Sequence, residues 1–113
     1  GTRGVVEAAR RAGVRRFLHM SAENTRPDAP DRYHTTKWAA EEIVRASGLD
    51  FTIFRPSMMF GRHDRNFNEL ARIIRRAPVV PVIGDGNYVW RPVWVGDVAR
   101  IFLAALEKPE STG

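Results

Sequence analysis

The sequence contains no cysteine, and this absence excludes a disulfide framework and a thiolate metal site. Lysine is scarce, since only Lys37 and Lys108 occur among 18 basic residues. No apolar run approaches the roughly 20 residues needed to cross a bilayer, so we expect no membrane span. The chain begins with residues 1–4, Gly-Thr-Arg-Gly, without an initiator methionine or a signal-peptide pattern. We therefore expect a fragment of a longer, cytoplasmic protein.

The 113 residues carry a net charge of +5, and 43% of them are hydrophobic, as is usual for a globular domain. The arginines are spread along the chain in short pairs near the ends of predicted helices, where cations favour the negative end of the helix dipole. A nucleic-acid-binding surface would instead cluster them on one face. We therefore interpret the charge as a solvated surface and do not expect nucleic acid as a partner.

Apolar periodicity predicts helices over residues 2–12, 32–47 and 66–76, and a last helix that follows Asp97. Segments 17–20, 51–55, 79–83 and 88–95 are expected as strands, with a turn over 84–87. Asp31 and Asp97 are the expected N-caps of their helices. Strands that alternate with helices predict βαβ units and a mainly parallel sheet. Ligands bind beyond the carboxyl ends of such strands, here at residues 20–21 and 55–57.

The segment Tyr33-His34-Thr35-Thr36-Lys37 is the most informative one. On a helix, Tyr33 and Lys37 lie one turn apart, within an apolar arc of about 120°. A nearby ammonium lowers the pKa of a tyrosine, so such a pair can exchange a proton with a hydroxyl or carbonyl. The alternative is a tyrosine that packs through its ring while Lys37 reaches solvent past it.

Five motifs in order resemble the short-chain dehydrogenase/reductase superfamily, and most closely its extended and atypical branches. These branches include NAD(P)-dependent epimerases and dehydratases, and NAD(P)-binding proteins related to an accessory subunit of respiratory complex I. The motifs are the helix over residues 1–9, the strand and its end over 17–22, the pair Tyr33 and Lys37, the loop Phe54-Arg55-Pro56-Ser57 with Phe60-Gly61, and the segment 91–99.

The resemblance implies an α/β fold, a Rossmann-like and mainly parallel sheet. It also implies that the sheet is incomplete, because the N-terminal phosphate-binding βαβ half is absent from this chain. Residues 1–77 would be the C-terminal half of the NAD(P)-binding domain, and residues 78–113 its substrate-side β segments and closing helix. The cofactor would be NAD or NADP. The substrate would be a small molecule, with a nucleotide sugar as one option, and a homo-oligomer is left open.

The resemblance also implies roles for single residues. Tyr33 would be the proton donor and acceptor, and Lys37 would hold the nicotinamide ribose. Arg55, Pro56 and Ser57 would lie beside the nicotinamide. Hydride transfer itself would belong to the cofactor.

Arg91 occupies the place of an arginine that binds the substrate diphosphate in sugar-nucleotide members, with a surface arginine as the alternative. The usual catalytic Ser or Thr aligns with Ala22, one residue after Ser21. Ser21 and Thr25 are therefore the substitute candidates, although for Ser21 a shift of one residue at a strand end turns the side chain to the opposite face. The three histidines have no metal-ligand spacing, so we expect no metal site.

Three hypotheses remain open from the sequence. The first is an NAD(P)-dependent epimerase/dehydratase-like or oxidoreductase domain, with an active full-length protein and an inactive isolated chain. The second, which Ala22 supports, is a non-catalytic NAD(P)-binding or scaffold protein. The third is a basic nucleic-acid-binding module, which only the pI and the tryptophans support.

Overall fold

The structure is a computed structural model that describes residues 1–80, 82, 84–87 and 89–113. The elements follow the order α1 (Thr2–Arg11), β1 (Arg16–Met20), α2 (Arg32–Arg45), β2 (Asp50–Phe54), β3 (Met59–Phe60), α3 (Arg65–Arg76), β4 (Val93–Trp94), α4 (Val95–Glu107) and the 3₁₀ turn η1 (Pro109–Ser111). Helices and strands alternate through the first half, as the periodicity predicted.

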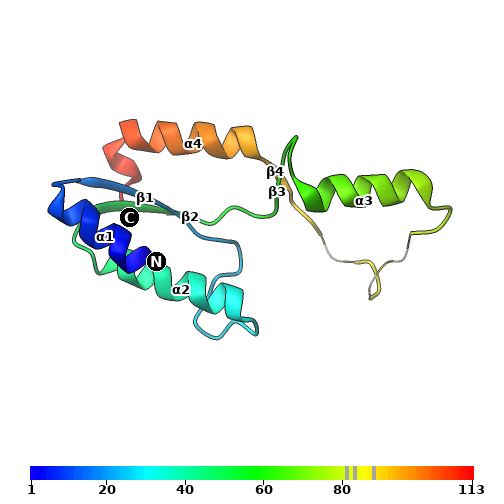
Figure 1. Cartoon of the computed structure of the whole chain (residues 1–113), viewed down its shortest axis with the longest axis horizontal. Helices are drawn as coiled ribbons and strands as arrows, with labels where there is room; N and C mark the ends of the chain where they lie inside the picture. The colour runs from blue at the N-terminus through cyan, green and yellow to red at the C-terminus, as the bar shows by residue number, and fades with distance from the viewer. Residues whose placement is uncertain (81, 83, 88) are drawn as a thin grey trace.

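The body of the molecule is built on the parallel pair β1 and β2, which α2 connects. Their register places Arg16 opposite Asp50 and Met20 opposite Phe54. Helix α4 covers one face of this pair, and α1 and α2 lie on the other (Figure 1). The predicted α/β class with parallel strands is therefore confirmed, and the carboxyl ends of both strands meet at one edge.

The hydrophobic core of the body is small. Val6 of α1, Val44 of α2 and Val98 of α4 are buried in it. Phe102 of α4 packs against Phe54 of β2, with ring centroids 4.4 Å apart. The apolar face of α4 is only partly covered, because Ile101 remains 51% exposed.

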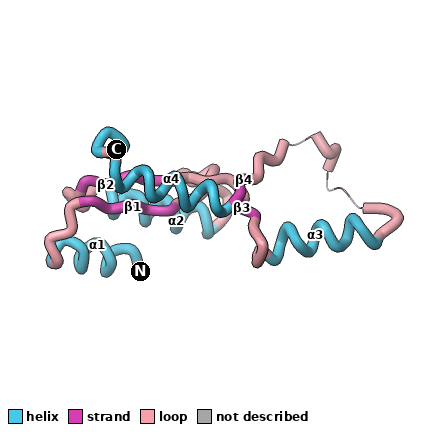
Figure 2. Tube along the Cα trace, turned by 90° about the horizontal axis from the view of Figure 1, so that it is seen from above, coloured by secondary structure: helices cyan, strands magenta, loops and turns pink. Residues whose placement is uncertain are grey.

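A second part of the chain, made of β3, α3, β4 and the described residues of 77–92, projects from the body, and we call it the α3 lobe (Figures 1 and 2). Its two short strands are parallel, with Met59 opposite Val93 and Phe60 opposite Trp94. The projection makes the molecule 57 Å long. The radius of gyration of 17.5 Å exceeds the value of about 13 Å that a compact chain of this length would have.

The α3 lobe departs from the expected strands. Positions 81 and 83 of the expected strand 79–83 lie outside the described residues, and Val79, Val80 and Val82 are not in a strand. In segment 88–95, position 88 lies outside the described residues, residues 89–92 are irregular, and only Val93–Trp94 pairs. Proline removes a ladder donor at positions 78 and 92, which limits regular pairing there.

The helix caps show one confirmed and one wrong prediction. Asp31 caps α2, since its carboxylate accepts the backbone N–H of His34 at 2.9 Å. Asp97 does not cap α4, because β4 runs directly into the helix and Trp94 is the N-cap residue. Asp97 lies instead in the first turn, where it pairs with Arg100.

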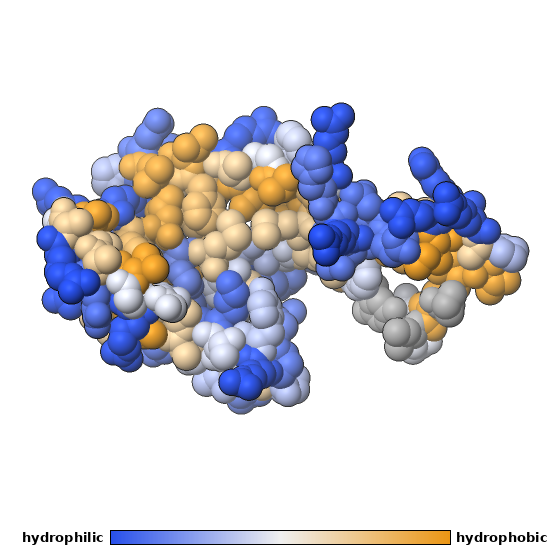
Figure 3. Space-filling model, in the orientation of Figure 1, coloured by the Kyte–Doolittle hydropathy of each residue, from blue (hydrophilic) through white to orange (hydrophobic). Residues whose placement is uncertain are grey.

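Apolar side chains remain exposed on the body. Figure 3 shows hydrophobic residues gathered over α4 and the sheet, and again on the α3 lobe. Leu103 and Leu106 of α4 are 63% and 53% exposed, and Val5 of α1 is 59% exposed. Among the described residues, no helix has the length and the apolar character needed to cross a membrane.

Candidate functional site

The residues that follow β1 and β2 are joined by backbone hydrogen bonds. The N–H of Ser21 donates to the carbonyl of Phe54 at 2.7 Å, and the N–H of Glu23 donates to that of Pro56 at 3.0 Å. The parallel hydrogen-bond ladder thus continues beyond Met20 of β1 and Phe54 of β2. It holds Ala22 between these two links, close to the Pro56–Ser57 segment, as the predicted meeting of the strand ends required.

Tyr33 and Lys37 lie side by side at this edge. The ammonium of Lys37 is 5.7 Å from the centroid of the Tyr33 ring, and it donates a hydrogen bond to the carbonyl of Met20 at 3.3 Å. Lys37 is half-buried between α2 and the end of β1, while Tyr33 is 57% exposed. The helix therefore presents the tyrosine to solvent and anchors the lysine on the strand behind it.

A cleft of about 890 Å³ opens between the body and the α3 lobe. Such a volume lies within the range of small-molecule sites. Its walls include residues from the end of β1, from the start of α2, from the segment after β2 and from the α3 lobe: Ala22, Tyr33, His34, Pro56, Ser57 and Arg91. The structure thus brings Tyr33, Pro56, Ser57 and Arg91 of the predicted site to one cavity.

Ser57 links the two walls of the cleft. Its hydroxyl donates a hydrogen bond to the backbone carbonyl of Arg91. Arg91 is exposed on the lobe side of the cleft. A cation there can bind an anionic group of a ligand.

Ser21 lies at the inner wall but is only 4% exposed. Its hydroxyl donates to the Thr25 hydroxyl at 3.3 Å, and it also helps to lower the pKa of the nearby Glu41 carboxyl. Ala22, the neighbouring wall residue, carries no hydroxyl. The predicted catalytic use of Ser21 therefore requires its hydroxyl to leave partners that it already has.

Glu41 is a buried charge that the sequence analysis missed. Its side chain is fully buried on α2, one turn after Lys37. Burial acts to raise the pKa of this carboxyl, but hydrogen bonds from Arg55, Ser21 and Arg45 outweigh it and lower the pKa to about 2. The position gave a weak signal, since Glu41 stands about 40° from Lys37 on the helical wheel, at the rim of the predicted face.

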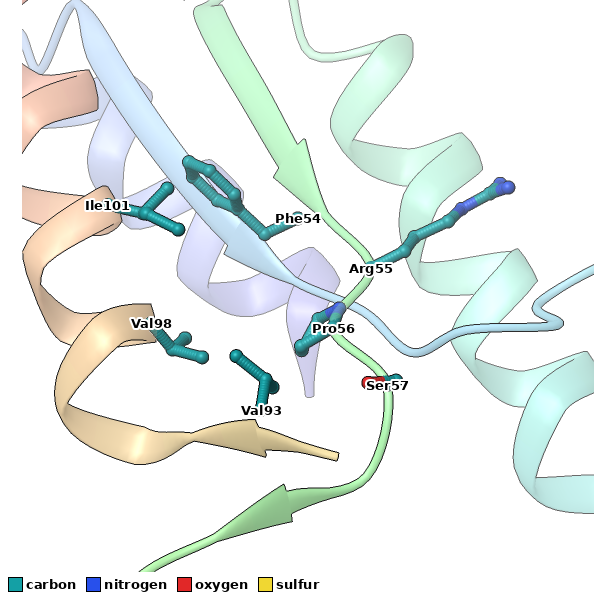
Figure 4. A pocket seen from close by; sticks show the side chains of 7 residues that line it. All are labelled: Phe54, Arg55, Pro56, Ser57, Val93, Val98 and Ile101. Carbon is teal, nitrogen blue, oxygen red and sulfur yellow. The ribbon is translucent and has the colours of Figure 1, made fainter. Parts of the chain in front are cut away.

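Arg55 does not point into the cleft. Its guanidinium donates to both carboxylate oxygens of Glu41, at 2.8 and 2.7 Å. Figure 4 shows the Arg55 side chain extending away from Pro56 and Ser57 toward the neighbouring helix. Its predicted contact with a cofactor stays a prediction, and in the present geometry the guanidinium binds the protein itself.

A smaller apolar pocket of about 300 Å³ adjoins the cleft on the α4 side (Figure 4). Pro56 and Ser57 line both cavities. The other lining residues are Arg55 and four hydrophobic residues: Phe54, Val93, Val98 and Ile101.

The histidines His19 and His34 differ in the partners that their side chains meet. No group of three or more metal-ligand residues occurs in the part of the chain that the structure describes. His34 bonds through Nδ1 to the Asp31 carboxylate at 2.6 Å, and hydrogen bonds from His34 lower the pKa of Asp31. His19 lies on β1, where its buried Nε2 has no partner among the described residues. Burial, followed by the nearby Lys37 charge, lowers the pKa of His19, while Glu41 acts in the opposite direction.

Comparison with known proteins gives consistent matches. A sequence model described as "NAD dependent epimerase/dehydratase family" matches residues 1–113. The NADH dehydrogenase [ubiquinone] 1 alpha subcomplex subunit 9, mitochondrial, of Rattus norvegicus is 36% identical over 98% of this chain and 29% of its own length. The ceramide reductase of Caulobacter vibrioides is 33% identical over 96% of this chain and 34% of its own length. The chain thus spans about a third or less of these relatives.

A solved structure supports the same fold. The enzyme WbmH of Bordetella bronchiseptica in complex with NAD+ superposes with a TM-score of 0.68 at 22% identity, over 94% of this chain and 40% of that one. At this identity the likeness concerns the fold. It confirms the Rossmann-like arrangement that the resemblance implied.

Proposed function

The chain belongs to the NAD-dependent epimerase/dehydratase family, and on this premise we propose that it forms a nicotinamide-nucleotide site in which Tyr33 is the acid/base group and Lys37 holds the nicotinamide ribose. The family match bears out the resemblance to the extended branch and its nicotinamide cofactor. The assignment of Tyr33 as the acid/base group and of Lys37 as the residue that binds the ribose is our own proposal.

The observation that carries the proposal is the place of Tyr33. Its exposed ring forms part of the wall of the 890 Å³ cleft, and the Lys37 ammonium lies 5.7 Å from the ring centroid. A ligand in the cleft can therefore reach the phenol, and the Lys37 cation lies over the ring behind it. A phenol so placed can give a proton to a carbonyl oxygen or take one from a hydroxyl.

The other wall residues fit the same ligand. Pro56 and Ser57 present an apolar ring and a hydroxyl where a nicotinamide would lie, and Arg91 offers a cation to an anionic part of the substrate. NAD, when bound, supplies the hydride chemistry. The protein residues position the reacting groups and handle the proton.

A second candidate function is nucleotide binding without catalysis. Ala22 supplies no hydroxyl at the wall, and the hydroxyl of Ser21 is held by Thr25 and Glu41. One of the relatives is a subunit of an NADH dehydrogenase. In this case Tyr33 and Lys37 would serve nucleotide binding alone.

Nucleotide binding is tested by calorimetric titration of the intact natural protein with NADH and NADPH. Lys37→Met removes a charge-assisted hydrogen bond to the ribose and is expected to weaken binding about tenfold or more. Lys108→Met is the matched control, because Lys108 is the other lysine and is exposed beyond α4. Absence of binding to both nucleotides would refute both candidate functions.

Catalysis is tested by turnover with NADH or NADPH and a panel of nucleotide sugars and carbonyl-bearing lipids. For an enzyme, Tyr33→Phe is expected to reduce turnover at least about 100-fold with little change in nucleotide affinity. Ala22→Ser places a hydroxyl on the wall and is expected to raise turnover. Equal turnover in the wild type and Tyr33→Phe would exclude Tyr33 as the acid/base group, and no turnover with tight NADH binding would favour the second candidate.

The properties of the whole protein follow as proposals. We propose a small-molecule substrate, a cytoplasmic location and a homo-oligomer for it. The division of the domain at residue 77 also stays a prediction. Strand β3 precedes this position and β4 follows it, and the two strands pair with each other.

A further inference from the structure

The buried carboxylate of Glu41 accepts several charge-assisted hydrogen bonds. Oε1 accepts from Nε of Arg55 at 2.8 Å, and Oε2 accepts from Nη2 of Arg55 and from Nη2 of Arg45, each at 2.7 Å. The Ser21 hydroxyl also lies near this carboxylate and helps to lower its pKa. An isolated carboxylate would be costly to bury, and these partners satisfy it from three directions.

Trp38 covers the two arginines. The guanidinium carbons of Arg45 and Arg55 lie 5.0 and 5.7 Å from the Trp38 ring, which places both cations where the ring attracts them. We call Glu41, Arg45, Arg55 and Trp38 the Glu41 clamp. Because α2 supplies all of it except Arg55, the clamp ties the segment after β2 to this helix.

Arg55 of the clamp and the neighbouring Ser21 adjoin the wall of the cleft in sequence. Arg55 directly precedes Pro56 and Ser57, and Ser21 directly precedes Ala22. Glu41 stands one helical turn after Lys37. One carboxylate is therefore joined to both strand ends and lies on the helix that carries the Tyr33–Lys37 pair.

We propose that Glu41 is a positioning residue, whose buried carboxylate fixes the segments after β1 and β2 and thereby sets the shape of the cleft wall that receives the nicotinamide end of the nucleotide. The inference rests on the proposed function, since it concerns the same cleft. It gives Arg55 a place in the site through Glu41 and not through direct contact with the cofactor. An error of about 1 Å in the placement of such a wall can cost up to about 100-fold in a reaction that depends on it.

The first test compares Glu41→Gln with Glu42→Gln in the intact protein. Glu42 is the matched control, because it neighbours Glu41 and also pairs with Arg45 at 2.7 Å, but its side chain is 54% exposed. Glu41→Gln is expected to weaken NADH binding about tenfold or more and to speed amide hydrogen exchange in residues 20–25 and 55–60. Glu42→Gln is expected to change NADH affinity less than about twofold. Equal NADH affinity in Glu41→Gln and the wild type would overturn the proposal.

A double variant separates positioning from mere stabilisation. Replacing both members of a buried ion pair by apolar residues is often tolerated, whereas removing one member leaves an unpaired charge. Glu41→Leu with Arg55→Leu is therefore expected to recover thermal stability relative to either single variant, yet to keep the weakened NADH affinity. Recovery of both together would show a purely structural role and would overturn the proposal.

These outcomes are distinct from a failure of the proposed function. If the wild type binds neither NADH nor NADPH, the proposed function is refuted. The exchange experiment then decides the positioning role alone: faster exchange at residues 20–25 and 55–60 in Glu41→Gln, but not in Glu42→Gln, supports it, and equal exchange overturns it.

Discussion

Glu41 makes the stability of the body sensitive to acid in a defined pH window. Its carboxyl has a pKa of about 2 in the folded state against an ordinary value of 4.5. A group whose pKa is depressed by folding contributes stability that is complete above the unfolded value and is lost as pH falls toward the folded one. The shift corresponds to about 3 kcal/mol, of which about 2 kcal/mol is lost by pH 3.

The assay is urea unfolding of the intact protein between pH 7 and pH 3, followed by tryptophan fluorescence, with Glu41→Gln as the reference. Asp31 and Asp85 also have lowered pKa values, because hydrogen bonds from His34 and Asn87 stabilise their carboxylates. Their contributions occur in both proteins and cancel in the comparison. The wild type is expected to be about 3 kcal/mol more stable than Glu41→Gln at pH 7 and about 1 kcal/mol more stable at pH 3.

The result that would refute this reasoning is a constant difference between the two proteins over the whole range. Such a result would mean that Glu41 titrates alike in the folded and unfolded states. Glu42→Gln supplies the control, since its exposed side chain is expected to leave the pH slope of the wild type unchanged.

Three further changes are expected to lower the free energy of unfolding in urea titrations. Val44→Ala removes two methyl groups from a fully buried site and is expected to cost about 2 kcal/mol. Asp31→Ala removes the side-chain cap of α2 and is expected to cost about 1 kcal/mol, whereas Asp31→Asn should retain most of the stability. Gly48→Ala places a side chain at φ 74° and is expected to cost about 1 kcal/mol, with Gly4→Ala in α1 as a neutral or stabilising control.

The helices and the parallel pair of the body were predictable because each follows from a local pattern. The apolar run at 17–20 predicts a buried strand, and the structure has β1 there. The segment between the cap Asp31 and the glycine at position 48 predicts a helix, and the structure has α2 there. The strands β3 and β4 have two residues each and are defined only by pairing between Met59 and Val93, 34 positions apart. A pattern of two residues cannot identify a strand, and pairing across a lobe is a property of the tertiary fold.

The candidate site divides in the same way. Tyr33, Pro56 and Ser57 were predictable because strand ends and a helical turn fix where they lie. Glu41 was not, since a glutamate on a helix is ordinarily solvated and becomes buried only when a distant partner such as Arg55 neutralises it. The direction of the Arg55 side chain follows from that pairing, so sequence reasoning placed the residue at the site but not its contacts.

The two walls of the cleft differ in the number of interactions that fix their positions. On the body side, the ladder bonds beyond β1 and β2 and the Glu41 clamp fix Tyr33 and Pro56 relative to one another. On the lobe side, Arg91 is joined to the body through the short β3–β4 pair and the hydrogen bond from Ser57. A pair of two-residue strands adds little stability of its own, so the lobe is the part whose position a ligand can set. A ligand that contacts both Tyr33 and Arg91 would stabilise by mass action the arrangement in which both residues line the cleft.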